Sequence, residues 1–332
     1  MTALVPLKPA PTLSELEAAF ADFIRVEVAN ADASEDTVRN YCTQIRSWMG
    51  WCGLMRVDPA AATITDVKRF RQTLVEAGYK PSGIRGRLSI VRRFYEALRS
   101  AGLRADNPAA GVRSPRIRNA VDDFKYLSDE ELTRLLSALP DAEQAEGEER
   151  IRRLRNRLLV ELMALHGLRT IEVYRASVED LTDKGVNLSL LLRGKTRDRI
   201  VYLRPDTAMK VKQYVTLRGE VPRDAVGTPL FTTLGFWGLD GRKNGRDGRR
   251  LDRTSIRTQI DKHLRIAGLK RPGISNHALR HTAATLGYLH TGDLRAVQEL
   301  LGHSDPRTTS RYAHVVDMGT KNPAMCIPGK LK

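Results

Sequence analysis

Apolar residues in the first third of the chain recur three and four positions apart, which is the spacing of one face of an α-helix. Thr12 followed by Glu15 has the pattern of a capping box and marks the start of the first predicted helix. Ser34 is expected to cap the second helix, and Gly53 is expected to end it. The predicted helices cover residues 12–30, 34–53, 65–77 and 82–101. The pattern therefore predicts a helical domain over residues 12–112.

Residues 113–125 break this pattern, because they carry Pro115 and alternating charge without apolar periodicity. We interpret them as a linker to a second domain over residues 126–315, which begins with another capping box at Ser128 and Glu131. The length of the chain, 332 residues, also exceeds one hydrophobic core, so two domains are expected.

The second domain mixes helical and strand patterns. Helical patterns cover residues 149–166, 205–218, 253–266, 276–289, 293–301 and 306–314. Two runs with strand character, at 186–192 and 199–203, flank the segment RGKTRD and predict a β-hairpin. The tail, residues 316–332, is broken by glycine and proline and is expected to be extended. The chain is thus predicted to be mainly α-helical with a small β-sheet.

Composition limits the class of protein. The chain is 41% hydrophobic and 28% charged, has no apolar run of about 18 residues, and begins without an apolar signal segment. Its three cysteines, Cys42, Cys52 and Cys326, form no CxxC pair, so neither a disulfide framework nor a zinc ribbon is indicated. We therefore expect a cytoplasmic protein that makes no membrane contact.

The strongest compositional signal is charge. Lysine and arginine total 55 against 39 acidic residues, a formal net charge of +16, which favours a polyanionic partner such as nucleic acid. Residues 241–271 alone contain eleven basic residues and three aspartates. In the helix predicted over 82–101, arginines at intervals of seven lie beside an apolar stripe, and either solvent or phosphates could face them. The residues expected to contact DNA are Arg85, Arg92, Arg99, Arg242, Lys243, Arg246, Arg249 and Arg250.

The segment HALRH places His277 and His281 four residues apart, as in zinc-binding histidine pairs. The zinc protease motif needs a glutamate where this chain has Ala278, and Arg280 would repel a cation, so a metal site is not expected. A histidine and an arginine three residues apart at a helix start suit a phosphate instead. A packed core histidine is the alternative for either ring.

Two further segments carry candidate chemistry. RGKTRDR contains Gly194-Lys195-Thr196, which matches the end of a phosphate-binding loop, but that motif needs a glycine five positions before Gly194, where this chain has Ser189. Lys195 at the hairpin tip could reach a nucleic-acid groove or be an ordinary exposed lysine. In HGLRTIE, Arg169 and Glu172 have the spacing of a local ion pair.

The last clear pattern, LGHSDPRTTSRYAHV at 301–315, places Tyr312 nine residues after His303. A free tyrosine is a poor nucleophile, because its phenol keeps its proton to about pH 10. A packed tyrosine or a groove-binding aromatic is the alternative.

Taken together and in order, these segments resemble the tyrosine recombinases, the phage-integrase and Xer-type family. The matching stretches are SEDTVRNYCTQIRSW, GLRTIE, GKTRDRIVYL, HALRHTAATL and VQELLGHSDPRTTSRYAHV. The resemblance covers most of residues 12–315. It implies a helical, SAM-like core-binding domain, the linker, and a mixed α/β catalytic domain.

The resemblance also implies roles for individual residues. The implied catalytic residues are Arg169, Lys195, His277, Arg280, His303 and Tyr312, with Glu172 and His281 in support. The two arginines would hold a DNA phosphate, the tyrosine would attack it, and the lysine would protonate the leaving 5′ oxygen. His277 would accept the tyrosyl proton or hold the phosphate, and His303 would bond a phosphate oxygen. Glu172 would orient Arg169, and His281 would be structural.

The implied activity is site-specific recombination through a 3′-phosphotyrosyl intermediate, which needs no metal or other cofactor. Integration, excision and resolution stay open as its biological task. The implied partner is double-stranded DNA with inverted-repeat core sites, bound by a homotetramer, and the sequence specifies no accessory protein. The tail, residues 316–332, is expected to contact a neighbouring protomer. The alternatives are a type IB topoisomerase and a non-catalytic DNA-binding protein of the same fold. The Gly-rich basic segment 232–250 matches no family motif, and we expect a surface loop near DNA.

Overall fold

A computed structural model gives the arrangement of the chain. It describes residues 11–28, 35–116, 125–185, 187–194, 198–234 and 248–302, together with residues 305, 309, 310 and 312. The chain divides into two compact units, residues 1–119 and 120–332. The point of division falls within the segment interpreted as a linker, of which residues 117–124 lie outside the described ranges.

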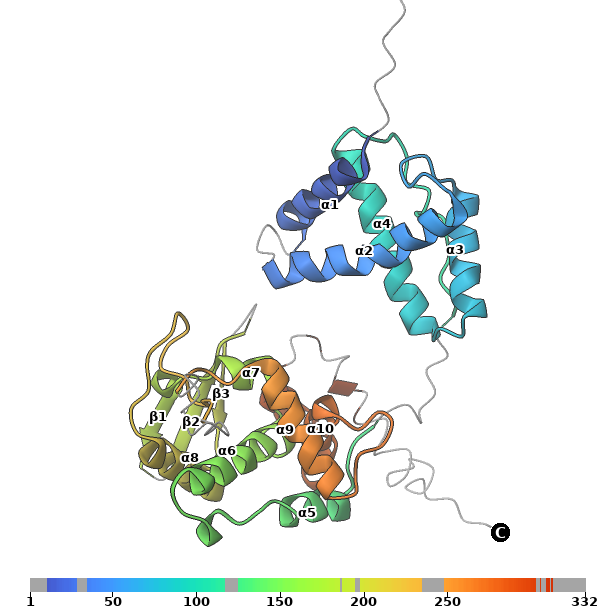
Figure 1. Ribbon diagram of the computed structural model, residues 1–332. Coiled ribbons are helices and arrows are strands. Elements are labelled where there is room, and N and C mark those ends of the chain that lie inside the picture. The colour runs from blue at the N-terminus through green and yellow to red at the C-terminus, as the bar shows by residue number, and fades with distance from the viewer. Residues whose placement is uncertain are drawn as a thin grey trace, which may run out of the picture. The chain divides into compact units, whose positions relative to one another are not determined.

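The first unit is helical (Figure 1). Its elements are α1 (Leu13–Glu27), α2 (Glu35–Met55), α3 (Ile64–Glu76) and α4 (Pro81–Ser100). Helix α4 packs against the other three, and this packing buries its apolar stripe. An aromatic group fills the core, with Trp48 stacked on Trp51 and in edge contact with Phe70. The capping box at Thr12 is confirmed, since its side chain accepts from the Glu15 amide.

One helix end differs from the prediction. Helix α2 continues through Gly53 to Met55, where the sequence pattern had it end at Gly53. Gly53 keeps helical backbone geometry, and Arg56, with φ of 53°, makes the left-handed turn that ends the helix. A glycine permits a helix end but does not require one.

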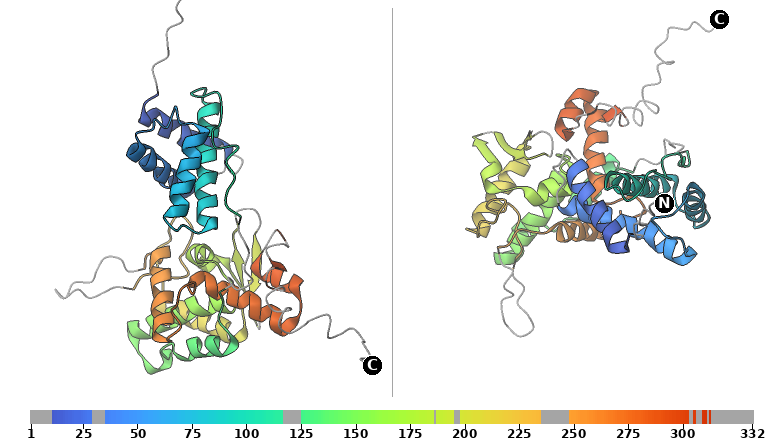
Figure 2. Two further views of the ribbon diagram at one scale, coloured as in Figure 1. Left: turned by 90° about the vertical axis from the view of Figure 1, so that its right-hand side faces the viewer. Right: turned by 90° about the horizontal axis from the view of Figure 1, so that it is seen from above.

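The second unit is built around α6 (Gly147–Ala164), which contacts α5 (Asp129–Ser137), α8 (Pro205–Arg218), α9 (Arg253–Ile266) and α10 (Asn276–Thr291). Among the described residues of this unit, shorter helices are α7 (Thr170–Arg175), α11 (Leu294–Leu301), η2 (Ala142–Gln144) and η3 (Val178–Asp180). The sheet and α8 lie on one side of α6, and α10 lies on the other (Figures 1 and 2). The buried faces of these elements form one apolar core.

The sheet has three antiparallel strands in the order β1–β2–β3. Strands β2 (Asn187–Leu192) and β3 (Arg199–Tyr202) form the predicted hairpin, in which Leu192 pairs with Arg199. Strand β1 (Leu181–Lys184) was missed, because three of its four residues are exposed and it shows no apolar alternation. The predicted fold class, mainly helical with a small sheet, is confirmed.

Candidate active site

Helix α7 carries the first candidate arginine. Arg169 is the N-cap of α7, and Glu172 accepts hydrogen bonds from its backbone N–H at 2.7 Å and from its Nη1 at 2.8 Å. Gly167, two residues before Arg169, has φ of +67°, and a Cβ there would lie 2.7 Å from Leu301 Cδ2. Residue 167 is therefore best suited to glycine, because the backbone there is left-handed and lies against Leu301 at the end of α11.

Glu172 is shared by three arginines. Its side chain is 8% exposed, and its Oε2 lies 2.8 Å from Arg199 Nη2 and 3.8 Å from Arg280 Nη1, besides the contacts from Arg169. Burial by itself would raise the pKa of Glu172, but Arg199, the Arg169 amide and the other guanidinium groups outweigh it, so the pKa is lowered. One carboxylate facing three guanidinium ions leaves two positive charges in excess within this group, which suits an anionic ligand.

Arg280 is held by backbone carbonyls. Its side chain is 6% exposed, and it donates to Gly167 O and, at 2.6 Å, to Leu301 O. Burial and, to a smaller extent, the positive charge of Arg169 lower the pKa of Arg280 to about 9. Arg280 is therefore still protonated at neutral pH. These two hydrogen bonds join α10 to the residues just before α7 and to the last residue of α11.

His277 lies next to these arginines. It is the second residue of α10 and is exposed. Partial burial lowers its pKa, and the charges of Arg257, Arg280 and Arg169 lower it further, so the ring is neutral at neutral pH. Asn276 Nδ2 donates to Thr170 Oγ1, which ties the start of α10 to the start of α7. This bond fixes His277 relative to Arg169.

Tyr312 lies beside α10. Its side chain is 2% exposed and packs in a small apolar cluster with Ala284, Tyr288, Val297 and Leu301. Its hydroxyl lies 3.0 Å from His281 Nδ1. Ionisation of the tyrosine would raise the pKa of the Arg280 guanidinium. The expected roles, proton acceptor or phosphate ligand for His277 and a structural role for His281, stay predictions.

Two expected catalytic residues cannot be placed. Lys195 and His303 both lie outside the described residues. Of the hairpin around Lys195, the structure describes Gly194, whose amide donates to Asp198 Oδ1 at 3.1 Å.

Arg199 was missed by the sequence analysis. Its side chain is 11% exposed and binds Glu172 directly. The sequence carries no signal for this, because residues 200–202 are all apolar and show no alternation. In the structure, side chains two apart on a strand share a face, and Val201 lies in the core at 2% exposure. The alternation of β3 therefore points Arg199 inward with Val201.

The arginines expected to contact DNA lie in different settings. In the first unit, Arg85 is exposed, and Arg99 is exposed and pairs with Glu96. Arg92 instead donates to the carbonyls of Ala109, at 3.1 Å, and Val112, at 2.6 Å. That placement gives Arg92 a role in holding the segment after α4. Arg242, Lys243 and Arg246 fall outside the described part of the chain.

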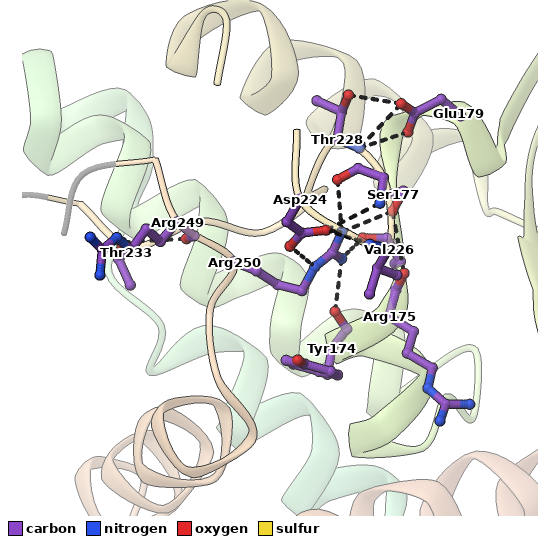
Figure 3. A network of polar contacts seen from close by, with 12 residues as sticks. Tyr174, Arg175, Ser177, Glu179, Asp224, Val226, Thr228, Thr233, Arg249 and Arg250 are labelled. Atoms are coloured by element: carbon purple, nitrogen blue, oxygen red, sulfur yellow. Dashed lines mark hydrogen bonds and ion pairs between the residues drawn. The ribbon is translucent and has the colours of Figure 1, made fainter. Parts of the chain in front are cut away.

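Arg250 is placed differently from the expected DNA-facing position. Its side chain is 5% exposed, whereas that of Arg249 is exposed. Figure 3 shows its guanidinium surrounded by acceptors. These are Asp224 Oδ2 at 2.7 Å, Ala176 O at 2.8 Å, Tyr174 O and Ser177 Oγ at 3.0 Å, and Gly227 O at 3.2 Å. Arg250 therefore fixes the end of α7, a helix too short to be stable alone.

Within the described ranges, no cluster of three or more histidine, cysteine or acidic residues could hold a metal ion. In the same ranges, no helix is both long and apolar enough to cross a bilayer.

Comparisons with known proteins identify the family of the chain. The profile of the phage integrase family matches residues 125–318, and that of the phage integrase N-terminal SAM-like domain matches residues 22–102. Tyrosine recombinase XerD of Brucella suis biovar 1 (strain 1330) is 30% identical over 302 residues, which span 90% of this chain and 93% of that protein.

Two solved structures share the fold. XerH site-specific recombinase bound to palindromic difH substrate, in a post-cleavage complex, has a TM-score of 0.73 at 18% identity and covers 98% of each chain. A lambda integrase tetramer bound to a Holliday junction has a TM-score of 0.61 at 15% identity, over 92% of this chain and 78% of that one.

Proposed function

The chain belongs to the phage integrase family and is a tyrosine site-specific recombinase, and from this premise we propose that it cuts and rejoins DNA through a 3′-phosphotyrosyl intermediate. The observation that carries the proposal is the group of three arginines around one carboxylate, with Tyr312 packed in one cluster with Leu301, whose carbonyl accepts from Arg280. Its two excess positive charges make a site for one phosphodiester.

The proposed chemistry begins at Tyr312. Its Oη attacks the phosphorus in line, forming a bond to the 3′ phosphate while the bond to the 5′ oxygen breaks. Arg169 and Arg280 neutralise the phosphate and stabilise the additional negative charge of the transition state. Removal of one such charged donor costs about 3 kcal/mol of barrier, roughly a hundredfold in rate.

Proton transfers complete the step. Lys195 donates a proton to the departing 5′ oxygen, and a neutral imidazole accepts the tyrosyl proton. His281 Nδ1 lies 3.0 Å from the hydroxyl and is one candidate acceptor. His277, whose ring is neutral and lies next to the arginines, is the other candidate acceptor or a ligand of the phosphate. His303 donates to a phosphate oxygen. Because the covalent bond conserves the phosphodiester energy, a second 5′-hydroxyl reverses the step without ATP.

The assembly is proposed from the relatives. Residues 12–112 would bind the core site, residues 126–315 would carry the chemistry, and the tail at 316–332 would contact a neighbouring protomer. A homotetramer would hold two duplexes with inverted-repeat sites. In support, the XerH structure is a complex with palindromic difH substrate, and the lambda integrase structure is a tetramer bound to a Holliday junction.

The test uses the full chain and DNA fragments from the genome of its source. Detergent-resistant protein–DNA adducts are isolated, and the attached fragments are sequenced to identify the site. We expect one inverted-repeat sequence to be enriched with the wild type, and Tyr312→Phe to bind that site without forming an adduct. Adducts that persist in Tyr312→Phe would refute the assignment of the nucleophile.

A second assay separates the enzymatic alternatives. Plasmids with paired copies of the enriched site are incubated with the protein and examined for exchanged strands. A recombinase yields recombinant products, whereas a type IB topoisomerase only relaxes supercoils, including those of plasmids that lack the site. Binding without any adduct in the wild type would indicate a non-catalytic protein.

A further inference from the structure

Arg199 joins three parts of the second unit. It begins strand β3, four residues after Lys195 in the chain, and its side chain is 11% exposed. Its Nη2 donates to Glu172 Oε2 at 2.8 Å, and its Nη1 donates to Leu300 O. One guanidinium therefore connects β3, α7 and the last turn of α11.

The contact on α11 falls at a helix end. The last carbonyls of an α-helix lack partners within the helix and carry partial negative charge, so a cation stabilises them. In α11 two consecutive carbonyls of this kind are used, Leu300 O by Arg199 and Leu301 O by Arg280. The two arginines together fix where α11 ends.

The end of α11 determines the surroundings of Tyr312. Leu301 belongs to the apolar cluster in which Tyr312 packs. Gly302 then turns the chain with φ of +60°, and a Cβ there would lie 2.5 Å from Arg199 Cδ. The stem of Arg199 therefore packs directly on the turn that leads from α11 to the tyrosine, ten residues later in the chain.

We propose that Arg199 is a positioning residue, which holds the end of α11, and with it Tyr312, in register with the Glu172–Arg169 pair. The assignment rests on the proposed role of Tyr312 as the nucleophile. The two terminal nitrogens of Arg199 donate to Glu172 and to Leu300 O, so its contacts join β3 to α7 and to the end of α11. The exposed guanidinium of the group is that of Arg169, at 38%.

A lysine cannot replace this arginine fully. A guanidinium presents five N–H donors in a fixed fork, whereas an ammonium is a point charge on a flexible stem. Lysine at residue 199 could serve Glu172 or Leu300 O, but not both in the same geometry. Partial activity of Arg199→Lys is therefore expected, between that of the wild type and that of Arg199→Met.

The experiment compares Arg199→Met and Arg199→Lys with a matched control, Arg155→Met. Arg155 is also buried, at 6% exposure, and donates to a carbonyl, Thr232 O, and to a side-chain oxygen, that of Asn156, but it does not contact the arginine group. The measurements are the single-turnover rate of adduct formation at saturating DNA, the Kd for the same DNA, and the melting temperature. Assays are run well below every melting temperature.

We expect Arg199→Met to lower the cleavage rate about 10- to 100-fold, with Kd within about threefold of the wild type. Arg155→Met should lower the melting temperature similarly but cleave within about threefold of the wild type. An Arg199→Met rate no lower than that of Arg155→Met would overturn the proposal. So would a loss that appears only in Kd.

A DNA whose scissile 5′ oxygen is replaced by sulfur separates two routes of action. A thiolate leaves without needing a proton, so this substrate should rescue Lys195→Ala. The Arg199→Met defect should persist on it, because the tyrosine is still misplaced. Rescue of Arg199→Met would show that the residue acts on the lysine hairpin instead, which contradicts the assignment. If the wild type forms no adduct on either DNA, the proposed function itself fails.

Discussion

The replacement Glu172→Gln tests the central feature of the site, one carboxylate among three guanidinium ions. Glutamine keeps the shape of the side chain and an oxygen that can accept from the Arg169 amide, now 2.7 Å from Oε2. It removes the charge that Arg169 and Arg199 approach to 2.8 Å and Arg280 to 3.8 Å. The three cations are then left without a counterion in a largely buried setting.

The expected cost follows from that burial. Glu172 is 8% exposed, and breaking a buried ion pair by removing one partner costs about 3–5 kcal/mol. For a unit of this size, each kcal/mol lowers the melting temperature by about 2–4 °C, so a decrease of about 6–20 °C is expected at pH 7. Differential scanning calorimetry of the full chain measures it, with the exposed Glu220→Gln as the matched control.

The pH dependence gives a second test of the same variant. The pKa of Glu172 in the folded protein is lower than its ordinary value, because the arginine charges outweigh burial. A carboxylate with a depressed pKa contributes its full stability above the unfolded value, about 4.3, and loses that contribution as the pH falls through the folded pKa. The difference between wild type and Glu172→Gln should therefore be constant from pH 7 to about 5 and shrink below it. A difference under about 1 kcal/mol at pH 7, or one that does not shrink in acid, would refute the reasoning.

Three further predictions concern arginines in other settings. Arg280→Lys should slow adduct formation about a hundredfold in single-turnover assays, because an ammonium cannot reproduce the paired donors of a guanidinium; a rate within threefold of wild type would contradict this. Arg250→Met should lower the stability of the second unit by about 3 kcal/mol in calorimetry, whereas Arg249→Met should leave it within about 0.5 kcal/mol. In binding titrations over a range of salt, Arg85→Gln should reduce the slope of log K against log salt by about 0.9 if Arg85 contacts a phosphate, whereas Arg92→Gln should chiefly destabilise the first unit.

The elements of the fold could be predicted from local patterns. Helix α9 has the predicted bounds, and the capping boxes at Thr12 and Ser128 mark the true starts of α1 and α5. These features depend on neighbours within four residues, which periodicity and capping describe directly. Strand β1 escaped prediction because its stability comes from pairing with β2 and not from an apolar face of its own.

Only some features of the site could be predicted from local sequence patterns. The sequence placed Arg169, Glu172, His277, Arg280 and Tyr312 in motifs, and the structure brings these segments together, with their roles still to be tested. Motifs could not show that Arg250 is buried beneath α7, or that His281 is the imidazole next to the tyrosyl hydroxyl. Exposure and long-range contact depend on packing between segments that are far apart in the chain.

The sequence by itself determined the helical character, the excess of positive charge and the family, since these are sums or local patterns of residue types. Only the tertiary structure decided which arginines share a counterion. Arg199 stands 27 residues from Glu172 and 101 from Leu300, yet one guanidinium binds both. Such a contact has no local signature, because it exists only when the hairpin, α7 and the end of α11 are brought together by the core beneath them.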